Sequence, residues 1–408
     1  MKLQGFSEYN DLYQWSINDR ESFWDALSIF CDVQFSSKPK DILSAGKSMI
    51  EDNWFHGAKL NFAEHLLRYE GNRAAIIFKG EQGRREEISF DELKFQVASV
   101  ASQLRKLGLK KNDCVAAFLP NCPEAIIAML ACSSMGIIWS SCSPDFGLEG
   151  VVERFGQINP KLLISCDGYF YNGKEINTIQ VTKKIVSQIE SIKNTLMVPF
   201  LETDSKNILK DAICWSNLIK DKVEIKFEAL PFDHPLYILY SSGTTGSPKC
   251  IVHGAGGTLL QHLKEHVLHY DINEQDRLFY FTTCGWMMWN WMVSGLSAGA
   301  TLVIYDGSPF YDNGNILWDL AESEKITVFG VSAKYLSAQE KAGIKPKKNY
   351  DLSSIETVLS TGSPLAPESF DYVYREIKND VQLSSVSGGT DIISCFVSGN
   401  PMLPVRRG

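Results

Sequence analysis

Short apolar runs and amphipathic stretches alternate along most of the chain. Runs rich in β-branched and aromatic residues predict buried strands at 74–78, 114–119, 137–142, 161–165, 236–240, 278–283, 301–305, 327–331, 357–362 and 381–389. Apolar positions at helical spacing predict helices at 7–35, 89–108, 123–136, 149–157, 258–268, 287–296, 315–323, 334–341 and 367–377. Strands that alternate with helices need crossover connections, so we expect an α/β fold with mainly parallel sheets and ligands at the strands' carboxyl ends.

The pattern divides the chain into three regions. We expect a helical N-terminal segment over 1–70, where Phe23, Leu27 and Phe30 share one helical face and should pack together. A first α/β subdomain should cover 71–230 and a second, similar one 231–408, with a small β-rich part as an option near the C-terminus. Residues 167–230 are harder to interpret, although 222–228 alternates as an edge strand would.

Composition and charge limit the functions to consider. The net charge of −8 and the lack of a Lys/Arg stripe argue against nucleic acid as a partner. The start lacks an apolar signal core, and the most apolar stretch, 125–139, is too short and too interrupted to span a membrane. The ten cysteines are scattered without paired spacing, which is typical of reduced core residues. We therefore expect a cytoplasmic protein without a membrane partner.

A loop rich in glycine and hydroxyl groups, 241–249 (SSGTTGSPK), follows the predicted strand 236–240. Gly243 and Gly246 let the main chain turn sharply and bring N–H groups towards an anion, while Lys249 adds a positive charge. The hydroxyl donors are Ser241, Ser242, Thr244 and Thr245. Such a cluster is often only a loop, and its spacing is not that of a Walker A motif. The residues alone therefore leave both a plain loop and a phosphate loop open.

Three further segments with candidate chemistry lie at predicted strand ends, namely 360–365 (STGSPL), 387–391 (SGGTD) and 285–291 (GWMMWNW). The glycines of the second let a flat ligand approach the main chain. Thr390 can donate to a phosphate oxygen, and Asp391 is a hard carboxylate that suits Mg²⁺. The third segment is dense in aromatic residues and methionine, which is more typical of a core than of a pocket. The carboxyl edge of a doubly wound sheet would bring all three together.

The histidines give no comparable indication. A lone histidine such as His253 is typically structural, and the sequence holds no Ser/His/Asp order. His262, His266 and His269 share one helical stretch without a fourth ligand, so zinc binding remains a weak alternative.

The string SSGTTGSPK after a strand closely resembles the phosphate loop of the acyl-adenylate-forming enzymes, and the resemblance runs from about Tyr9 to the end of the chain. The segment 54–63 (WFHGAKLNFA) resembles the acetyl- and acetoacetyl-CoA synthetase branch of that family. The resemblance implies the fold of the family's large N-terminal domain. The family's adenine-bordering turn matches Gly362, Ser363 and Pro364. Most members carry Thr-Glu where this chain has Thr-Asp at 390–391.

The same resemblance implies further nucleotide contacts and an acyl pocket. Nucleotide contacts are expected from Ser387, Gly388, Gly389 and Thr390, and acyl contacts from Trp286, Asn290, Val331 and Gly388. Acetyl-CoA synthetases have a tryptophan pair where this chain has Ser-Gly at 387–388, so we expect room for a longer acyl group. Asn290 or a nearby Ser or Thr hydroxyl is a candidate donor to a β-oxo oxygen, which favours acetoacetate over butyrate.

The family's contacts with the nucleotide end of CoA match Phe146, Gly147 and Arg154. The resemblance implies a two-step ligation in which the acid attacks the α-phosphorus of ATP and the CoA thiol then displaces AMP. Thr245, Lys249 and Asp391 are the expected catalytic groups, with Asp391 on Mg²⁺. ATP, Mg²⁺, CoA and acetoacetate are thus the expected cofactors and substrates.

The family usually continues with a ribose-binding aspartate, a hinge and a small mobile domain that carries a further catalytic lysine. We expect this chain to be the nucleotide- and acyl-binding portion of such an enzyme, with weak nucleotide binding and slow or no turnover on its own. Two alternatives stay open: a synthetase for another short acid such as propionate or butyrate, and a non-catalytic nucleotide-binding homologue.

Overall fold

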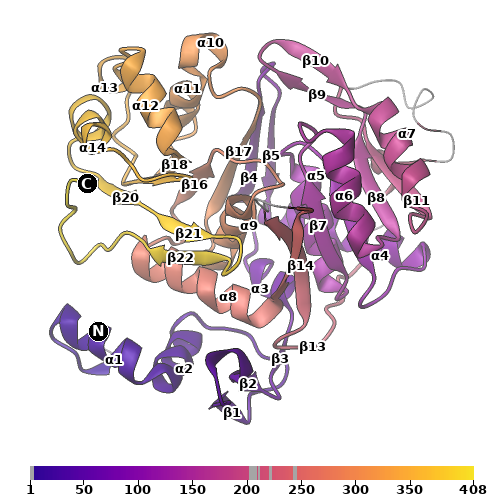
Figure 1. The fold of residues 1–408 in the computed structure, drawn as a ribbon, viewed down its shortest axis with the longest axis horizontal. Helices are drawn as coiled ribbons and strands as arrows, with labels where there is room; N and C mark the ends of the chain where they lie inside the picture. The colour runs from indigo at the N-terminus through magenta and orange to yellow at the C-terminus, as the bar shows by residue number, and fades with distance from the viewer. Residues whose placement is uncertain (1–3, 202–208, 210–211, 220–222, 242–245) are drawn as a thin grey trace.

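The computed structural model describes residues 4–201, 209, 212–219, 223–241 and 246–408 (Figure 1). Its α-helices are α1 (Tyr9–Asn18), α2 (Arg20–Phe30), α3 (Phe62–Leu66), α4 (Phe90–Lys106), α5 (Pro123–Ser134), α6 (Leu148–Ile158), α7 (Ile179–Gln188), α8 (Ala255–Leu263), α9 (Met287–Val293), α10 (Tyr311–Gly314), α11 (Ile316–Ser323), α12 (Ala333–Lys341), α13 (Pro346–Asn349) and α14 (Pro367–Tyr372). Short 3₁₀ segments are η2 (Met49–Glu51), η4 (Trp215–Asn217) and η6 (Ser294–Ala298), and π-helical turns are η5 (Lys264–His269) and η7 (Val373–Ile377).

The first of two large sheets has seven strands in the order β12-β11-β8-β6-β7-β14-β15. The strands are β6 (Cys114–Phe118), β7 (Ile138–Cys142), β8 (Leu162–Cys166), β11 (Asn194–Val198), β12 (Ile213–Cys214), β14 (Pro235–Ser241) and β15 (Lys249–Gly254). Neighbours are parallel except at one edge, where β15 runs antiparallel to β14.

The second sheet also has seven strands, in the order β20-β19-β18-β16-β17-β4-β5. They are β4 (Ala74–Gly80), β5 (Arg85–Ser89), β16 (Arg277–Tyr280), β17 (Thr301–Asp306), β18 (Val328–Ser332), β19 (Thr357–Thr361) and β20 (Gln382–Ser385). Again only the edge pair, β4 with β5, is antiparallel. The predicted α/β fold with mainly parallel sheets is therefore confirmed.

Each sheet draws strands from both sides of residue 230, where we expected one subdomain to give way to the other. The pair β14–β15 completes the first sheet, and the early pair β4–β5 completes the second. Small antiparallel pairs lie outside both sheets: β1 (Asp41–Ser44) with β2 (Asn53–His56), β3 (Lys59–Leu60) with β13 (Leu230–Pro231), β9 (Gly168–Tyr171) with β10 (Lys174–Asn177), and β21 (Ser387–Gly389) with β22 (Ser394–Val397). The division of the chain into domains at 70 and 230 remains a prediction.

Helix positions follow from local chemistry. Ser89 caps α4, since its side chain accepts a hydrogen bond of 3.1 Å from the Glu92 N–H. In α5, which begins at Pro123, every residue except Glu124 is buried, because this helix packs in the largest apolar cluster of the molecule. The most apolar stretch of the sequence is thus a core helix followed by β7. Of the helices in the described ranges, none has both the length and the apolar character that a bilayer crossing requires.

Two local predictions in the less regular regions are wrong. Leu27 is buried in α2, but Phe30 is 54% exposed because the helix ends there and the chain turns away. Residues 223–229 form no strand in spite of their alternation, and only Leu230–Pro231 pairs, with β3. Alternation in a short polar stretch is weak evidence for a strand, because a strand forms only where the edge of a sheet is available to pair with it.

Candidate functional site

The carboxyl ends of strands from both sheets converge on one cavity of about 1110 Å³. Strand-end residues that line it are Cys142, Tyr240, Tyr280, Thr361 and Ser385. Parallel strands end at the same edge of a sheet, so the crossover topology itself produces this meeting point. The cavity is also bordered by β21, by β22 and by the start of α9.

The predicted adenine-bordering turn lies at this edge. Gly362, Ser363 and Pro364 follow β19 and line the cavity, and Gly362 has φ +90°, a conformation that favours glycine. Thr361 donates a hydrogen bond of 2.7 Å from its hydroxyl to the Val386 carbonyl, which joins the ends of β19 and β20. The predicted nucleotide residues Ser387, Gly388, Gly389 and Thr390 line the same cavity.

Only part of the predicted phosphate loop falls within the described residues: Ser242, Gly243, Thr244 and Thr245 lie outside them. Ser241 ends β14 and pairs with Lys249, which starts β15, so the loop connects two antiparallel strands. Gly246 and Lys249 are exposed, and neither lines the cavity. Tyr240, the residue before the loop, does line it.

The predicted CoA-binding residues lie at another side of the cavity. The Arg154 guanidinium stacks 4.7 Å from the centre of the Phe146 ring and 5.8 Å from that of Tyr240. It also donates a hydrogen bond of 2.7 Å to the Gly150 carbonyl, one turn earlier on α6. Phe146 and Arg154 line the cavity, whereas Gly147 is the N-cap residue of α6 and does not. These contacts hold the planar, positively charged guanidinium of Arg154 at the rim of the cavity.

The predicted acyl residues are only partly brought together. Trp286 and Gly388 line the cavity, and Trp286 is 56% exposed. Asn290 and Val331 are buried and do not line it, and the side-chain amide of Asn290 has no hydrogen-bond partner among the described residues. Met287, Met288 and Trp291, from the predicted segment 285–291, also line the cavity, as do Glu265, Tyr270 and Tyr280, for which we had predicted no role.

These lining side chains form what we call the aromatic end of the cavity: Tyr270, Tyr280 and Trp291, with Glu265. The Trp291 ring centre lies 5.8 Å from that of Tyr270 and 6.2 Å from that of Tyr280. Glu265 is 3% exposed and accepts hydrogen bonds from the Trp291 Nε1–H at 2.8 Å and the Ser394 hydroxyl at 2.5 Å. A buried carboxylate is tolerated because such donors replace its hydration. The density of aromatics in 285–291 was the only sequence signal for this end.

Gly388 does not leave the room that its small size suggests. A Cβ atom at this position would lie 2.5 Å from the Cys395 Cα and would overlap the Ser394 carbonyl oxygen. The reason is the pairing of β21 with β22, in which Gly388 lies opposite Cys395. The glycine is therefore required by the close approach of two backbones.

The turn that carries Thr390 and Asp391 is held from below by His262. The His262 Nε2–H donates to the Ile393 carbonyl at 2.9 Å, and its Nδ1 faces the Ser294 hydroxyl at 2.7 Å. Ile393 has φ +49°, which is strained for a β-branched residue and requires such support. Thr390 lines the cavity and Asp391 is exposed beside it. This arrangement holds the main chain of the turn that carries the residues predicted to meet phosphate and metal.

His266 and His269 also bind main-chain carbonyls, those of Trp291 and Gly399, at 2.9 and 2.8 Å. Burial lowers the pKa of His262 to about 4 and that of His266 to about 3, so both rings are neutral at physiological pH. In the described part of the chain, no three His, Cys, Asp or Glu residues are grouped to hold a metal ion. The structure therefore gives these histidines a positioning role.

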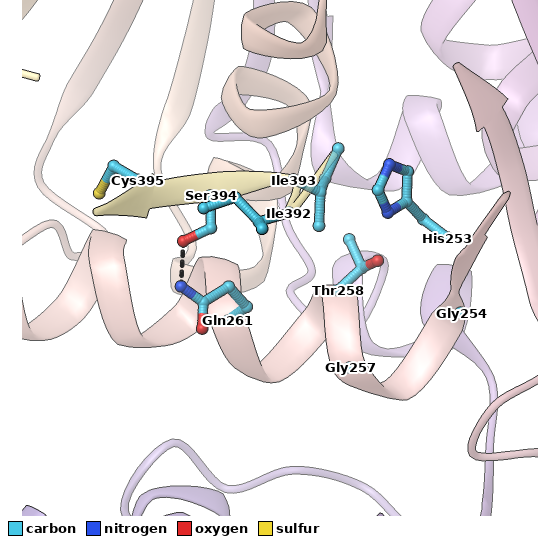
Figure 2. A pocket seen from close by; sticks show the side chains of 9 residues that line it. All are labelled: His253, Gly254, Gly257, Thr258, Gln261, Ile392, Ile393, Ser394 and Cys395. Atoms are coloured by element: carbon cyan, nitrogen blue, oxygen red, sulfur yellow. Dashed lines mark hydrogen bonds between the residues drawn. The ribbon is translucent and has the colours of Figure 1, made fainter. Parts of the chain in front are cut away.

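A smaller pocket of about 450 Å³ lies between α8 and β22 (Figure 2). His253 and Thr258 line one side of it, and the Gln261 side chain reaches the Ser394 hydroxyl at the other. Ser394 and Cys395 line both this pocket and the large cavity. Strand β22 is thus a thin partition between the two spaces.

Comparison with known proteins agrees with this architecture. The chain matches the family described as AMP-binding enzyme over residues 62–407, and the family described as acetyl-coenzyme A synthetase N-terminus over residues 9–66. The chain therefore belongs to the AMP-binding enzyme family, and the predicted resemblance to adenylate-forming enzymes is confirmed.

Individual relatives show which members of this family the chain resembles. An acetoacetyl-coenzyme A synthetase of Rhizobium meliloti (strain 1021) is 50% identical over 410 residues, covering 99% of this chain and 62% of the relative. An acetoacetyl-CoA synthetase of Mus musculus is 45% identical over 411 residues, covering 98% and 61%. The solved structure of acetoacetyl-CoA synthetase from Streptomyces lividans has a TM-score of 0.95 at 41% identity, covering 99% of this chain and 63% of that one. The chain thus spans less than two thirds of the length of these proteins.

Proposed function

We propose that this chain is the nucleotide- and acyl-binding part of an ATP-dependent acid–CoA ligase whose acid is acetoacetate. The observation that carries the proposal is the convergence of the turns 362–364 and 387–390 with the aromatic end on a single cavity. An acyl-adenylate has a flat polar base at one end and a short acyl group at the other, which matches the two kinds of lining. The names of the similar proteins support the same acid.

The proposed reaction has two displacement steps. A carboxylate oxygen of the acid attacks the α-phosphorus of ATP, and the bond from that phosphorus to diphosphate breaks. The CoA thiolate then attacks the acyl carbon, and AMP leaves with the electron pair of the acyl–oxygen bond. In this scheme 362–364 and 387–390 hold the adenylate, while Lys249 and the loop before it, with Thr245, take the outer phosphates.

CoA would approach past the stacked Arg154. Its guanidinium is held in a plane by Phe146 and Tyr240 and can therefore meet a phosphate with two parallel N–H groups. A lysine would supply charge without this geometry. Gly147, at the start of α6, belongs to the same proposed contact surface.

Mg²⁺ would be held by Asp391. The exposed carboxylate lies next to Thr390 on the cavity wall, and a single carboxylate combined with phosphate oxygens and water is a usual environment for this ion. When bound, Mg²⁺ would offset the negative charge that collects on the phosphates. The aspartate in place of the more common glutamate keeps the same donor on a shorter arm.

Calorimetry of the 408-residue chain with acyl sulfamoyladenosines, which imitate the adenylate but do not hydrolyse, tests the proposal. We expect the acetoacetyl analogue to bind about tenfold or more tightly than the acetyl and butyryl analogues, since an unpaired buried polar group penalises the wrong acid. Thr390→Val should weaken all three, and Thr195→Val on β11, away from the cavity, should change none. If the three analogues bind with equal affinity, the proposal that the acid is acetoacetate is wrong. If none of them binds, the proposed nucleotide site is wrong.

A further inference from the structure

The floor of the aromatic end is a row of residues at one level of the second sheet. Tyr280 on β16 lies opposite Gly330 on β18, Gly330 lies opposite Leu359 on β19, and Leu359 opposite Ser384 on β20. Tyr280, Leu359 and Ser384 all line the cavity. A Cβ atom on Gly330 would lie 2.5 Å from the Tyr280 Cε2, so the phenol ring extends over the glycine and across the sheet. Gly330 therefore lets Tyr280 form the floor.

Most polar groups at the aromatic end are already committed to partners within the protein. The Trp291 N–H and the Ser394 hydroxyl both donate to Glu265. The Tyr270 hydroxyl is paired with Ser398, and the Gln382 amide donates to the His269 carbonyl at 2.9 Å. These donors cannot serve a ligand without leaving a buried acceptor unpaired.

Tyr280 differs from them. Its side chain is 3% exposed, and the hydroxyl contacts the Val331 carbonyl at 3.5 Å, the outer limit for a hydrogen bond. Burial raises the pKa of Tyr280, so the phenol keeps its proton and remains a donor. A buried hydroxyl with so weak a partner gains most when an acceptor arrives in the cavity.

Building on the proposed function, we infer that Tyr280 is a specificity-determining residue whose hydroxyl donates a hydrogen bond to the β-oxo oxygen of the acyl group. A β-oxo acid supplies the acceptor that the phenol lacks. A saturated acid of the same length places a methylene there and leaves the hydroxyl with its weak contact to Val331. Tyr280 thus takes the role that sequence reasoning gave to Asn290, which is buried away from the cavity.

Ser384 offers the matched control. Its hydroxyl also lacks a hydrogen-bond partner among the described residues, and it lies in the same row. However, the Gly399 backbone packs directly against this hydroxyl, since a Cβ atom on Gly399 would overlap the Ser384 Oγ. The Gly399 backbone therefore covers the Ser384 hydroxyl, and Ser384→Ala removes a hydroxyl of the same floor without removing the proposed donor.

The test compares Tyr280→Phe and Ser384→Ala with the unmodified chain by calorimetry, using the acetoacetyl and butyryl sulfamoyladenosines. Tyr280→Phe should lower the acetoacetyl-over-butyryl preference about 10- to 100-fold by weakening acetoacetyl binding alone. Ser384→Ala should keep the preference. If Tyr280→Phe weakens both analogues equally, or if Ser384→Ala abolishes the preference, the inference is wrong.

A second measurement needs no variant. In the complex with an acetoacetyl analogue that carries ¹³C at the β-oxo carbon, a hydrogen bond should shift the infrared stretch of that carbonyl to lower frequency than in an aprotic solvent. An unshifted band would overturn the inference while leaving the proposed function in place. A failure of the unmodified chain to bind any adenylate analogue would instead overturn the proposed function.

Discussion

The two ends of the large cavity are built in different ways. The proposed nucleotide end consists of the turn 362–364 after β19 and of strand β21 with Thr390, with glycine at the points of closest approach. The aromatic end consists of buried side chains from η5, β16 and α9, with the Glu265 carboxylate at its centre. One end depends on the path of the main chain and the other on the identity of side chains.

This difference separates two tasks. A turn that binds through main-chain groups serves any acyl-adenylate, because it does not depend on what the acyl group is. Side chains that satisfy most of one another's hydrogen bonds, and leave the Tyr280 hydroxyl with only a weak partner, would distinguish acids by a single oxygen. We therefore expect substitutions at the aromatic end to change which acid is bound, and substitutions at the turns to change whether any adenylate is bound.

Acid should act most strongly through two buried histidines, His262 beneath the turn 390–393 and His266 beside Trp291. The folded-state pKa values of about 4 for His262 and about 3 for His266 lie below the ordinary 6.5, so the unfolded chain takes up these protons first. The contribution of the two neutral rings to stability is fully present above about pH 6.5, and between pH 6 and 4 the free energy of unfolding should fall by about 3 kcal/mol per pH unit. Urea unfolding at a series of pH values measures this slope.

The double variant His262→Gln, His266→Gln is the control for this slope. Glutamine keeps a donor for the carbonyls but does not titrate, so the acid-dependent loss should shrink by the same amount. An unchanged slope would show that other groups cause the acid sensitivity.

Removing the carboxylate at the centre of the aromatic end should have the next largest effect. Glu265→Leu leaves the Trp291 N–H and the Ser394 hydroxyl buried without an acceptor, and should lower the free energy of unfolding by about 2–4 kcal/mol. Glu265→Gln retains an acceptor oxygen and should lose less. Equal losses for the two variants, measured by urea unfolding, would mean that the side chain acts by filling space.

At the nucleotide end, two neighbouring glycines give a sharp contrast. Gly388→Ala forces a methyl group against the backbone of Ser394 and Cys395, and should cost about 1–3 kcal/mol of stability. A Cβ atom on Gly389 meets nothing within 4 Å, so Gly389→Ala should change stability little. If thermal unfolding shows the same midpoint for both variants, the close approach of β21 and β22 does not constrain the turn.

The smallest expected effect concerns Arg154 at the rim of the cavity. Arg154→Ala should weaken CoA binding about tenfold by removing a planar charge, without changing the affinity for acyl sulfamoyladenosines. Arg375→Ala, an exposed arginine on η7, is the control and should affect neither ligand. Loss of analogue binding in Arg154→Ala would mean that Arg154 shapes the nucleotide site instead.

The contrast between the two ends also explains what sequence could predict. Turns such as 362–364 are contiguous in sequence, so a single short motif predicts their chemistry. Most parallel strands are predicted from their apolar runs. At the aromatic end, sheet register brings Tyr280 and Ser384 together, and a hydrogen bond joins Glu265 to Trp291; no local sequence pattern records these contacts. The edge strands β5 and β15 were missed for a related reason, because charged or exposed residues interrupt their apolar pattern.

The exchange of strands between the sheets has a consequence for synthesis of the chain. The pair β4–β5 leaves the ribosome long before β17, the parallel neighbour of β4, since the Thr301 hydroxyl on β17 donates a hydrogen bond to the Ala74 carbonyl on β4 across 227 residues. Until β17 emerges, the apolar strand β4 has one edge whose backbone hydrogen-bonding groups are unpaired. Such an edge on a nascent chain binds chaperones or leads to aggregation. Slowing translation just before residue 301 should therefore lower the yield of folded protein more than slowing it after residue 306.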